Sequence, residues 1–302
     1  MHKIAFIIPY FGKWPEWMEL YIDSIERNPT IDFHFITDCD RSISTADNIY
    51  FHETTFEEYV NNAQKILDVP INIPNAYKIC DLRPFFGLIH EDIIKGYDFF
   101  GWTDVDLLFG DIRSFYTDEV LKNHDVLSSH AIRLAGHCAL LRNTANYRNM
   151  GYKIYNWEKT LQNPKFVGID EHGLTNALTM TFWDKLSEKL KMPWIAQVFS
   201  WRRKQKTKRY YFVEQYTTPF TPIPWLDGSI NNDQPEEWFY NKGKVTNTRD
   251  KGREFMYIHF MNFKSSQWRH DGTKAPWEGM ETYCHGEPSS RARINTKGIY
   301  YL

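Results

Sequence analysis

Two aspartates one residue apart have the type and spacing best suited to chemistry. Asp104 and Asp106 interrupt the apolar run over residues 99–110. Along an extended backbone, side chains two residues apart point the same way, so both carboxylates can hold one hard divalent cation at the end of a buried strand. Such a cation, Mn²⁺ or Mg²⁺, can neutralise the diphosphate of a nucleotide-sugar. Acidic residues that face water or cap a helix would give the same short pattern.

A histidine near the end of the chain is the candidate third ligand. The strand-like residues 255–258 lead into His259, and Lys264 follows five positions later. A neutral imidazole is a good ligand for Mn²⁺, and an ammonium group can hold a phosphate as a point charge. A buried structural histidine is the alternative interpretation, because nothing in one sequence brings His259 close to the aspartates.

A second acidic pair, Asp170 and Glu171, follows Gly168 and precedes a helical pattern that reaches Leu178. Asp170 can cap that helix through its carboxylate. A contact with a substrate is an equally simple interpretation of the pair.

Composition limits the class of protein. The chain has 302 residues, 42% of them hydrophobic, and a net charge of -2, so it can bury the core of one large or two fused domains and does not suit general nucleic-acid binding. Its four cysteines show no paired spacing, and we interpret them as reduced thiols of a cytosolic protein. The apolar start is too short for a signal peptide or a membrane span. The aromatic content of 17% suits a protein that stacks on sugar rings.

Strand and helix patterns alternate in the first half of the chain. Strands are expected over residues 4–8, 31–37 and 48–51, and helices over 15–26, 55–67 and 77–95, the last interrupted or started near Pro84. This alternation predicts an α/β fold with a mostly parallel, doubly wound sheet. Ligands of such sheets lie beyond the carboxyl ends of the strands, so the loop over residues 9–12, Asp38 and the two aspartates should share one rim.

The second half is less regular. Strands are expected over residues 125–129 and 136–142, and a helix over 144–161. From Trp201 to Tyr211, six basic residues occupy eight positions between flanking aromatic residues. This basic run suits docking on anionic lipid headgroups, where each basic residue contributes about 1 kcal/mol. A solvated basic surface is the simpler alternative.

Together these segments resemble GT-A fold glycosyltransferases, in particular the retaining, metal-dependent group that includes glycogenin and bacterial lipopolysaccharide glucosyl- and galactosyltransferases. The resemblance rests on the first strand and its loop, residues 78–83 upstream of the Asp-Val-Asp motif, the Asp170 turn and residues 259–264. It spans about residues 1–270. It implies a Rossmann-like GT-A domain there, with a nucleotide-sugar half over about 1–125, an acceptor half over about 126–270, and an irregular extension over 271–302.

The resemblance implies a ligand set for the metal and the diphosphate. Asp104, Asp106 and His259 would bind Mn²⁺ or Mg²⁺, while Lys264 would bind the diphosphate. The group has the pattern H-x-x-G-x-x-K followed by Pro-Trp, whereas here the lysine comes one position early and Asn262 replaces the glycine. The ending from His259 to Trp268 is also similar to retaining mannosyltransferases related to yeast outer-chain initiation, so the transferred sugar stays open.

The remaining implied roles concern the nucleotide and the sugar. The nucleotide would lie against the loop after the first strand, with Tyr10 or Phe11 against the base. Arg83 and Asp81 would contact the donor sugar or brace the metal site. The residues assigned to the nucleotide-sugar cofactor, besides Lys264, are Pro9, Tyr10, Phe11, Asp38 and Lys78.

The acidic pair is assigned to the reacting sugar. Asp170 or Glu171 would orient the acceptor or stabilise positive charge at the anomeric carbon, because an oxocarbenium-like transition state needs a nearby carboxylate. Retention of configuration is what the resemblance implies, and a general-base role for either residue would give inversion instead.

The sequence therefore predicts a metal-dependent hexosyltransferase. It would move a hexose from a UDP-sugar to a glycan acceptor, lipid-linked in one interpretation, in the synthesis of bacterial capsule or lipopolysaccharide. It would lie in the cytoplasm, with peripheral contact to the inner face of the membrane through Trp201 to Tyr211. The alternatives are a non-catalytic carbohydrate-binding protein and a sugar nucleotidyltransferase, although the latter should carry a glycine-rich loop where this chain has residues 9–13.

Overall fold

The computed structural model describes residues 1–219, 235–260, 283–295 and 297–302. The chain divides into two compact units that alternate along the sequence. The first unit comprises Met1–His2, Glu57–Trp102 and Glu119–Val213. The second unit comprises Lys3–Phe56, Thr103–Asp118 and Glu214–Leu302.

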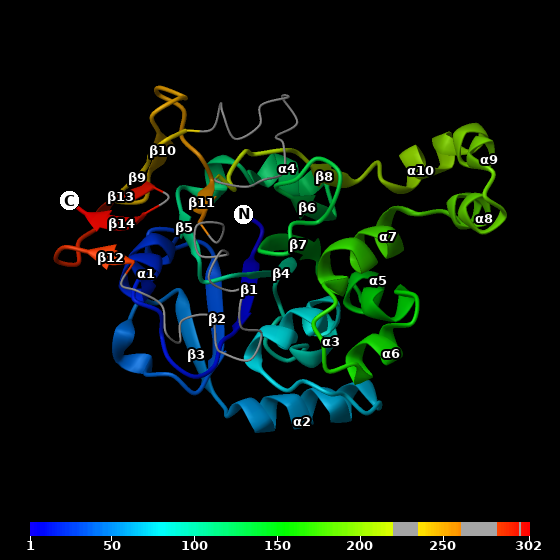
Figure 1. Cartoon of the computed structure of the whole chain (residues 1–302), viewed down its shortest axis with the longest axis horizontal. Coiled ribbons are helices and arrows are strands. Elements are labelled where there is room, and N and C mark those ends of the chain that lie inside the picture. Colours follow the sequence, from blue (N-terminus) through cyan, green and yellow to red (C-terminus); the bar gives the residue numbers. More distant parts are fainter. Residues whose placement is uncertain (220–234, 261–282, 296) are drawn as a thin grey trace. The chain divides into compact units, whose positions relative to one another are not determined.

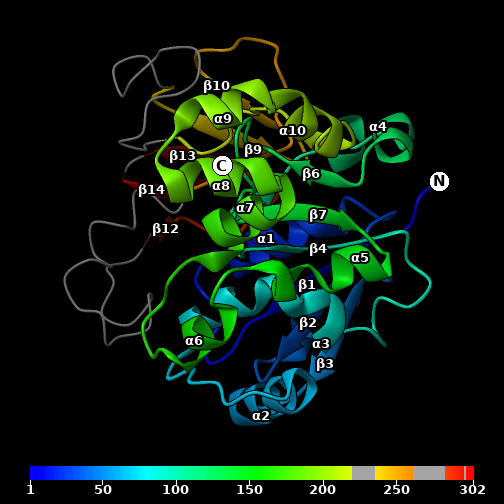
Figure 2. The same cartoon turned by 90° about the vertical axis from the view of Figure 1, so that its right-hand side faces the viewer.

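The first unit combines a small group of strands with most of the helices (Figures 1 and 2). Its strands follow the order β4, β7, β6, β8, in which β6 pairs antiparallel with β7 and parallel with β8. These strands are β4 (Phe99–Thr103), β6 (Val126–Ser128), β7 (Cys138–Arg142) and β8 (Tyr210–Phe212). The helices are α2 (Phe56–Leu67), α3 (Phe86–Ile89), α4 (Asp118–Asn123), α5 (Ala145–Arg148), α6 (Trp157–Gln162), α7 (Leu174–Thr179), α8 (Phe182–Leu190), α9 (Pro193–Val198) and α10 (Ser200–Lys206).

Two of the predicted helices of this unit are broken into shorter pieces, the first of them near Pro84, where the sequence predicts an interruption or a start. Residues 77–95 form the 3-10 helix Ala76–Phe85 and the short α3, because Pro84 lacks an amide hydrogen and cannot continue an α-helix. Residues 144–161 are divided into α5, the 3-10 helix Met150–Lys153 and α6. Asn156, at φ 56°, interrupts this stretch just before α6 begins.

The second unit begins with three parallel strands in the order β3, β2, β1. β1 (Ile4–Pro9) is buried along almost its whole length, as its continuous apolar run predicts. β2 (Asp32–Thr37) follows α1 (Met18–Glu26), and β3 (Ile49–Glu53) follows the 3-10 helix Arg41–Ile43. The elements expected over residues 4–8, 15–26, 31–37 and 48–51 are therefore confirmed, with ends shifted by up to three residues.

The same unit holds a two-stranded pair and a five-stranded sheet. β5 (Leu107–Phe109) pairs antiparallel with β11 (Tyr257–His259). Gly110 allows this pairing, because a Cβ atom there would lie 2.4 Å from the Phe255 carbonyl oxygen. The five-stranded sheet has the order β10 (Val245–Asn247), β9 (Trp238–Asn241), β13 (Arg291–Asn295), β14 (Gly298–Tyr301) and β12 (Cys284–His285).

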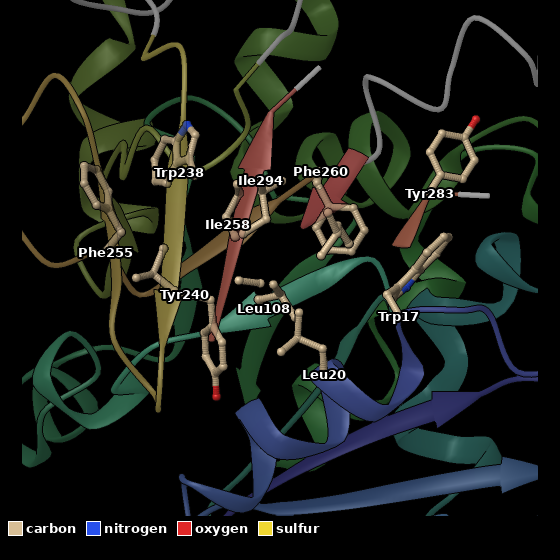
Figure 3. Packing of buried hydrophobic residues seen from close by; sticks show 13 residues of the cluster. Trp17, Leu20, Leu108, Trp238, Tyr240, Phe255, Ile258, Phe260, Tyr283 and Ile294 are labelled. Atoms are coloured by element: carbon tan, nitrogen blue, oxygen red, sulfur yellow. The ribbon is translucent and has the colours of Figure 1, made fainter. Parts of the chain in front are cut away.

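A hydrophobic cluster joins these strands to α1 (Figure 3). Leu108 of β5 and Ile258 of β11 pack in it with Trp17, which lies just before α1. The rest of the cluster comes from α1 and from the strands around the five-stranded sheet: Leu20, Trp238, Tyr240, Val245, Phe255, Phe260, Tyr283, Ala292, Ile294 and Ile299. The strand pair β5–β11 is therefore anchored by apolar side chains drawn from both ends of the sequence.

The predicted fold class, an α/β fold with a mostly parallel sheet flanked by helices and an irregular C-terminal portion, is confirmed. The four cysteines form no disulfide. Within the part of the chain that the structure describes, every helix falls short of the length and apolar character that crossing a bilayer requires.

Candidate functional site

Asp104, Asp106 and His259 come together in the second unit. One ligand atom from each lies within 4.8 Å of the other two. The Nε2 atom of His259 is 3.7 Å from Oδ1 of Asp106. Asp106 and His259 are only 6% and 2% exposed, whereas Asp104 is partly accessible. The structure thus brings together the three residues that the sequence assigned to a metal.

The sequence predicts that strand alternation places the two aspartates, but the structure places them differently. Asp104 follows the last residue of β4, and Asp106 precedes the first residue of β5, so both lie in the bend between the strands. Trp17 holds this bend, because its indole Nε1 donates a hydrogen bond of 2.8 Å to the Val105 carbonyl. The Trp17 ring also packs edge-to-face on Phe260, at a centroid distance of 5.4 Å.

His259 is placed by the pairing of β11 with β5, in which it lies opposite Leu107. Its backbone amide donates to the carbonyl of Thr217 (2.8 Å), and the amide of Phe260 donates to the carbonyl of Asp106 (3.1 Å). The Thr218 hydroxyl lies 3.3 Å from Nδ1 of the His259 ring. This contact at Nδ1 orients the ring with Nε2 toward Asp106, as second partners commonly orient metal-binding histidines.

The cluster fits a divalent cation. Two carboxylates and one imidazole are a donor set that suits Mn²⁺, and Mg²⁺ accepts the carboxylates. The carboxylate of Asp106 lies in a nearly buried position, where a negative charge needs compensation. A cation bound by the three side chains would supply it.

The loop after β1 is shaped by Asp38. Its Oδ1 atom accepts a hydrogen bond of 2.8 Å from the amide of Gly12, which has φ 101°. The thiol of Cys39 donates to the carbonyl of the same glycine. Asp38 therefore fixes the path of the loop that the sequence assigned to the nucleotide, and Pro9 is the last residue of β1 before it.

Of the two aromatic residues in this loop, Phe11 is buried and packs edge-to-face on Phe56. Tyr10 stacks instead on Trp14, at 5.1 Å between ring centroids. Burial raises the pKa of Tyr10, and the nearby Cys39 and Asp106 raise it further, so the phenol stays neutral.

In the first unit, Lys78 and Asp81 form a buried ion pair of 2.6 Å with side chains 1% and 0% exposed. Asp81 also accepts hydrogen bonds of 2.8–3.0 Å from the amides of Val167, Gly168 and Ile169. Lys78 donates in addition to the Thr160 carbonyl. The sequence predicts that Lys78 and Asp81 contact the nucleotide-sugar. In the structure both side chains are buried inside the unit, where they hold the backbone of residues 167–169 and the Thr160 carbonyl instead.

The segment that Asp81 holds leads into Asp170. Asp170 does not cap a helix: it lies inside the π-helical turn Ile169–Gly173 and forms an ion pair of 2.9 Å with Arg83. Arg83 also donates to the Gly136 carbonyl at 2.5 Å. Burial raises the pKa of the Asp170 carboxyl to about 6; Arg83 opposes this shift, and the charge of Glu171 adds to it.

Glu171 forms an ion pair of 2.6 Å with Arg133, and both side chains are about a quarter exposed. Its Oε1 atom accepts from the Gly136 amide at 3.2 Å. A Cβ atom at Gly136 would lie 2.8 Å from that oxygen, so the glycine makes room for the carboxylate. Gly136 therefore connects the two acidic residues. Its carbonyl accepts a hydrogen bond from Arg83, the partner of Asp170, and its amide donates one to Glu171.

Sequence reasoning missed the residues that support these groups: Trp14, Trp17, Arg133, Gly136 and Thr218. A tryptophan, an arginine or a threonine is common on any surface or in any core, so none of them carries a signal of its own. Lys264 lies outside the described residues.

Residues 6–283 match a protein family of unknown function, DUF6625. The chain belongs to this family. A search of curated proteins found no sequence that matches this chain.

The solved structures to which this DUF6625 member is similar include glycosyltransferases. The galactosyltransferase LgtC, in complex with donor and acceptor sugar analogues, is 12% identical with a TM-score of 0.36, over 58% of this chain and 70% of that one. Mouse xyloside xylosyltransferase 1 is 9% identical with a TM-score of 0.37, over 71% and 87%. The glycosyltransferase GlyE of Streptococcus pneumoniae is 10% identical with a TM-score of 0.31, over 76% and 57%.

Removal of the Asp81 carboxylate should destabilise the protein. Asp81→Ala leaves the Lys78 charge buried and three backbone amides without their acceptor, so we expect a loss of about 3–5 kcal/mol in the free energy of unfolding. Urea denaturation followed by circular dichroism measures it. Asp92→Ala, at an exposed position of the same unit, should cost less than about 0.5 kcal/mol. Equal midpoints for the two variants would contradict the supporting role of Asp81.

Mn²⁺ binding, measured by titration calorimetry, should depend on both a ligand and its support. His259→Ala removes an imidazole donor and should weaken binding by about a hundredfold or more. Trp17→Phe keeps the packing on Phe260 but loses the hydrogen bond to Val105, and should weaken binding by about tenfold. His285→Ala, an exposed histidine of the same unit, is the matched control and should bind like the parent protein. Unchanged affinity in His259→Ala would exclude His259 as a ligand.

Proposed function

We propose that this chain is a metal-dependent glycosyltransferase that moves a hexose from a UDP-sugar to a hydroxyl group of a glycan. The observation that carries the proposal is the convergence of Asp104, Asp106 and His259. These side chains come from a bend and a strand that lie far apart in the sequence, and together they offer the donor set that a cation bound to diphosphate requires. A bound cation would neutralise the charge that develops on the departing diphosphate.

In the proposed reaction, the bond between the anomeric carbon and the diphosphate oxygen breaks, and UDP leaves with the electron pair. The acceptor oxygen forms the new bond at the anomeric carbon, and its proton passes to a base or to the departing diphosphate. The resemblance in sequence supports retention of configuration.

The loop after β1 would receive the nucleotide. Asp38 keeps this loop in place through Gly12, and Tyr10 presents a neutral phenol stacked on Trp14. We assign the base to Tyr10 rather than Phe11, because the Phe11 ring is already packed in the core. The resemblance assigns the diphosphate to Lys264.

The resemblance in sequence assigns the Asp170 turn to the reacting sugar. In its ionised form, Asp170 can stabilise the positive charge of an oxocarbenium-like transition state. Arg83 orients this carboxylate, whereas Glu171 is oriented by Arg133 and Gly136. Lys78 and Asp81 act as positioning residues, because they hold the backbone that precedes the turn.

For the biological setting we propose the cytoplasmic synthesis of a bacterial surface polysaccharide, capsule or lipopolysaccharide, on a lipid-linked acceptor. The resemblance in sequence to bacterial lipopolysaccharide glycosyltransferases supports this setting.

The test is release of UDP from a panel of UDP-hexoses, with and without Mn²⁺ and with glycan acceptors. The parent protein should release UDP only with the metal, and Asp104→Asn and Asp106→Asn should each lose at least about a hundredfold in rate while keeping the parent's circular dichroism and melting temperature. Asp47→Asn, an exposed aspartate of the same unit, should remain fully active.

Other outcomes would overturn the assignment. Formation of a nucleotide-sugar from a nucleoside triphosphate and a sugar phosphate, with release of pyrophosphate, would indicate a nucleotidyltransferase. Binding of glycans that neither UDP nor Mn²⁺ affects, with no turnover of any UDP-hexose, would indicate a carbohydrate-binding protein.

The pH dependence of transfer should follow Asp170. Its pKa of about 6 lies above the usual value of 3.8, so the carboxyl takes up a proton as the pH falls through 6. We therefore expect kcat/KM to fall about tenfold for each pH unit below 6. Glu171→Gln removes a charge that raises this pKa and should move the acid limb to lower pH. Mn²⁺ titrations over the same range separate this effect from loss of metal, and an acid limb unchanged in Glu171→Gln would contradict it.

A further inference from the structure

The helices α8, α9 and α10 carry an unusual group of exposed apolar side chains. They follow one another in the first unit and lie side by side in Figures 1 and 2. Six large apolar side chains in this segment are between 44% and 69% exposed: Phe182, Leu190, Met192, Trp194, Val198 and Trp201. Exposed apolar groups of this density mark a surface that binds another phase or partner.

The three helices form an ordered arm. Thr181 and Asp184 make a capping box at the start of α8, and Arg203 of α10 forms an ion pair with the same Asp184. The rings of Trp183 and Phe199 stack at 3.9 Å. The exposed apolar residues are therefore held outward by a defined structure.

Along α8, the apolar residues form a stripe. Phe182, Leu186 and Leu190 follow one another at intervals of four, which places them on one face of the helix, and Lys185 and Lys189 lie beside that face. Asp184 lies on the opposite side and is buried, as is Ser187. In α9, Trp194 and Val198 repeat the interval of four.

The arm is strongly basic. Residues 182–209 contain nine lysines and arginines against two acidic residues, and one of these acids, Asp184, is buried. Three cations are used inside the unit: Arg203 binds Asp184, Lys206 donates to the carbonyls of Ala177 and Met180, and Arg209 binds Asp125.

The other six cations form no ion pair with the described residues: Lys185, Lys189, Lys191, Arg202, Lys204 and Lys208. The basic run from Trp201 to Tyr211 therefore contains residues of two kinds. Arg203, Lys206 and Arg209 stabilise the fold, while the lysines of α8 and the α8–α9 connection, which lie outside the run, join Arg202, Lys204 and Lys208 as available charges.

We propose that the α8–α10 arm docks on an anionic lipid bilayer, with the apolar side chains at the boundary of the acyl chains and the six available cations among the headgroups. Five of these cations are lysines. Lysine is depleted at protein–protein interfaces, whereas lysine beside exposed Trp, Phe and Leu is typical of interfacial membrane helices. The inference does not depend on glycosyl transfer, so either can fail without the other.

The test is co-sedimentation of the full-length protein with two kinds of vesicle. One contains phosphatidylcholine alone, and the other contains phosphatidylcholine with about 30% phosphatidylglycerol. We expect binding to the anionic vesicles only. A charge variant, K185Q/K189Q/K191Q/K204Q, should lower the partition coefficient by about a hundredfold or more. Its matched control, K65Q/K95Q/K122Q/K159Q, removes four exposed lysines elsewhere in the same unit and should bind like the parent protein.

An apolar variant, F182S/W194S/V198S, tests insertion, with Y155S as a control at an exposed aromatic residue outside the arm. Lipids brominated in the acyl chain should quench tryptophan fluorescence in the parent protein and much less in W194F/W201F. Equal recovery with neutral and anionic vesicles, or equal binding by the charge variant and its control, would overturn the proposal. A dimer in analytical ultracentrifugation that the apolar variant abolishes would instead assign the arm to a second copy of the chain.

Discussion

The pairing of β5 with β11 is the interaction on which the candidate site depends. It sets His259 opposite Leu107, the residue after Asp106. The imidazole thereby comes close to the carboxylates of Asp104 and Asp106, although more than 150 residues separate them in the sequence. The pairing is held by Leu108 and Ile258, whose side chains enter the cluster around Trp17. Because strand register fixes which side chains meet, a shift of one residue would turn His259 away from the aspartates.

In the first unit, the constraint is charge in a buried place. Asp81 compensates Lys78 and also accepts three backbone amides, so its cost of burial is offset by hydrogen bonds as well as by the ion pair. The next carboxylate, Asp170, has one cation beside it and an acidic neighbour, and its pKa rises to about 6. Two aspartates in one network thus differ in character because their partners differ.

The same division between support and function runs through the cationic residues of α10. Arg203 forms an ion pair with the buried carboxylate of Asp184 inside the arm. Its neighbours in sequence, Arg202 and Lys204, are exposed and form no ion pair with the described residues. Successive residues of a helix point in directions about 100° apart, so neighbours in a basic run meet different surroundings. The charge of such a run therefore overstates what is available for binding.

The sequence by itself determined the strands and helices of residues 4–67, because their apolar patterns have clear periods and clear ends, and it marked Asp104, Asp106, His259 and Asp170 by residue type and spacing. It marked a break near Pro84, but it could not determine the 3-10 helix that contains this residue or the division of residues 144–161 into three short helices. Nor could it distinguish the roles of two aspartates: Asp81 accepts hydrogen bonds from three backbone amides, whereas the pKa of Asp170 is raised by burial. Only the tertiary structure decided these points, because burial, strand register and hydrogen-bond partners are set by residues far apart in the chain.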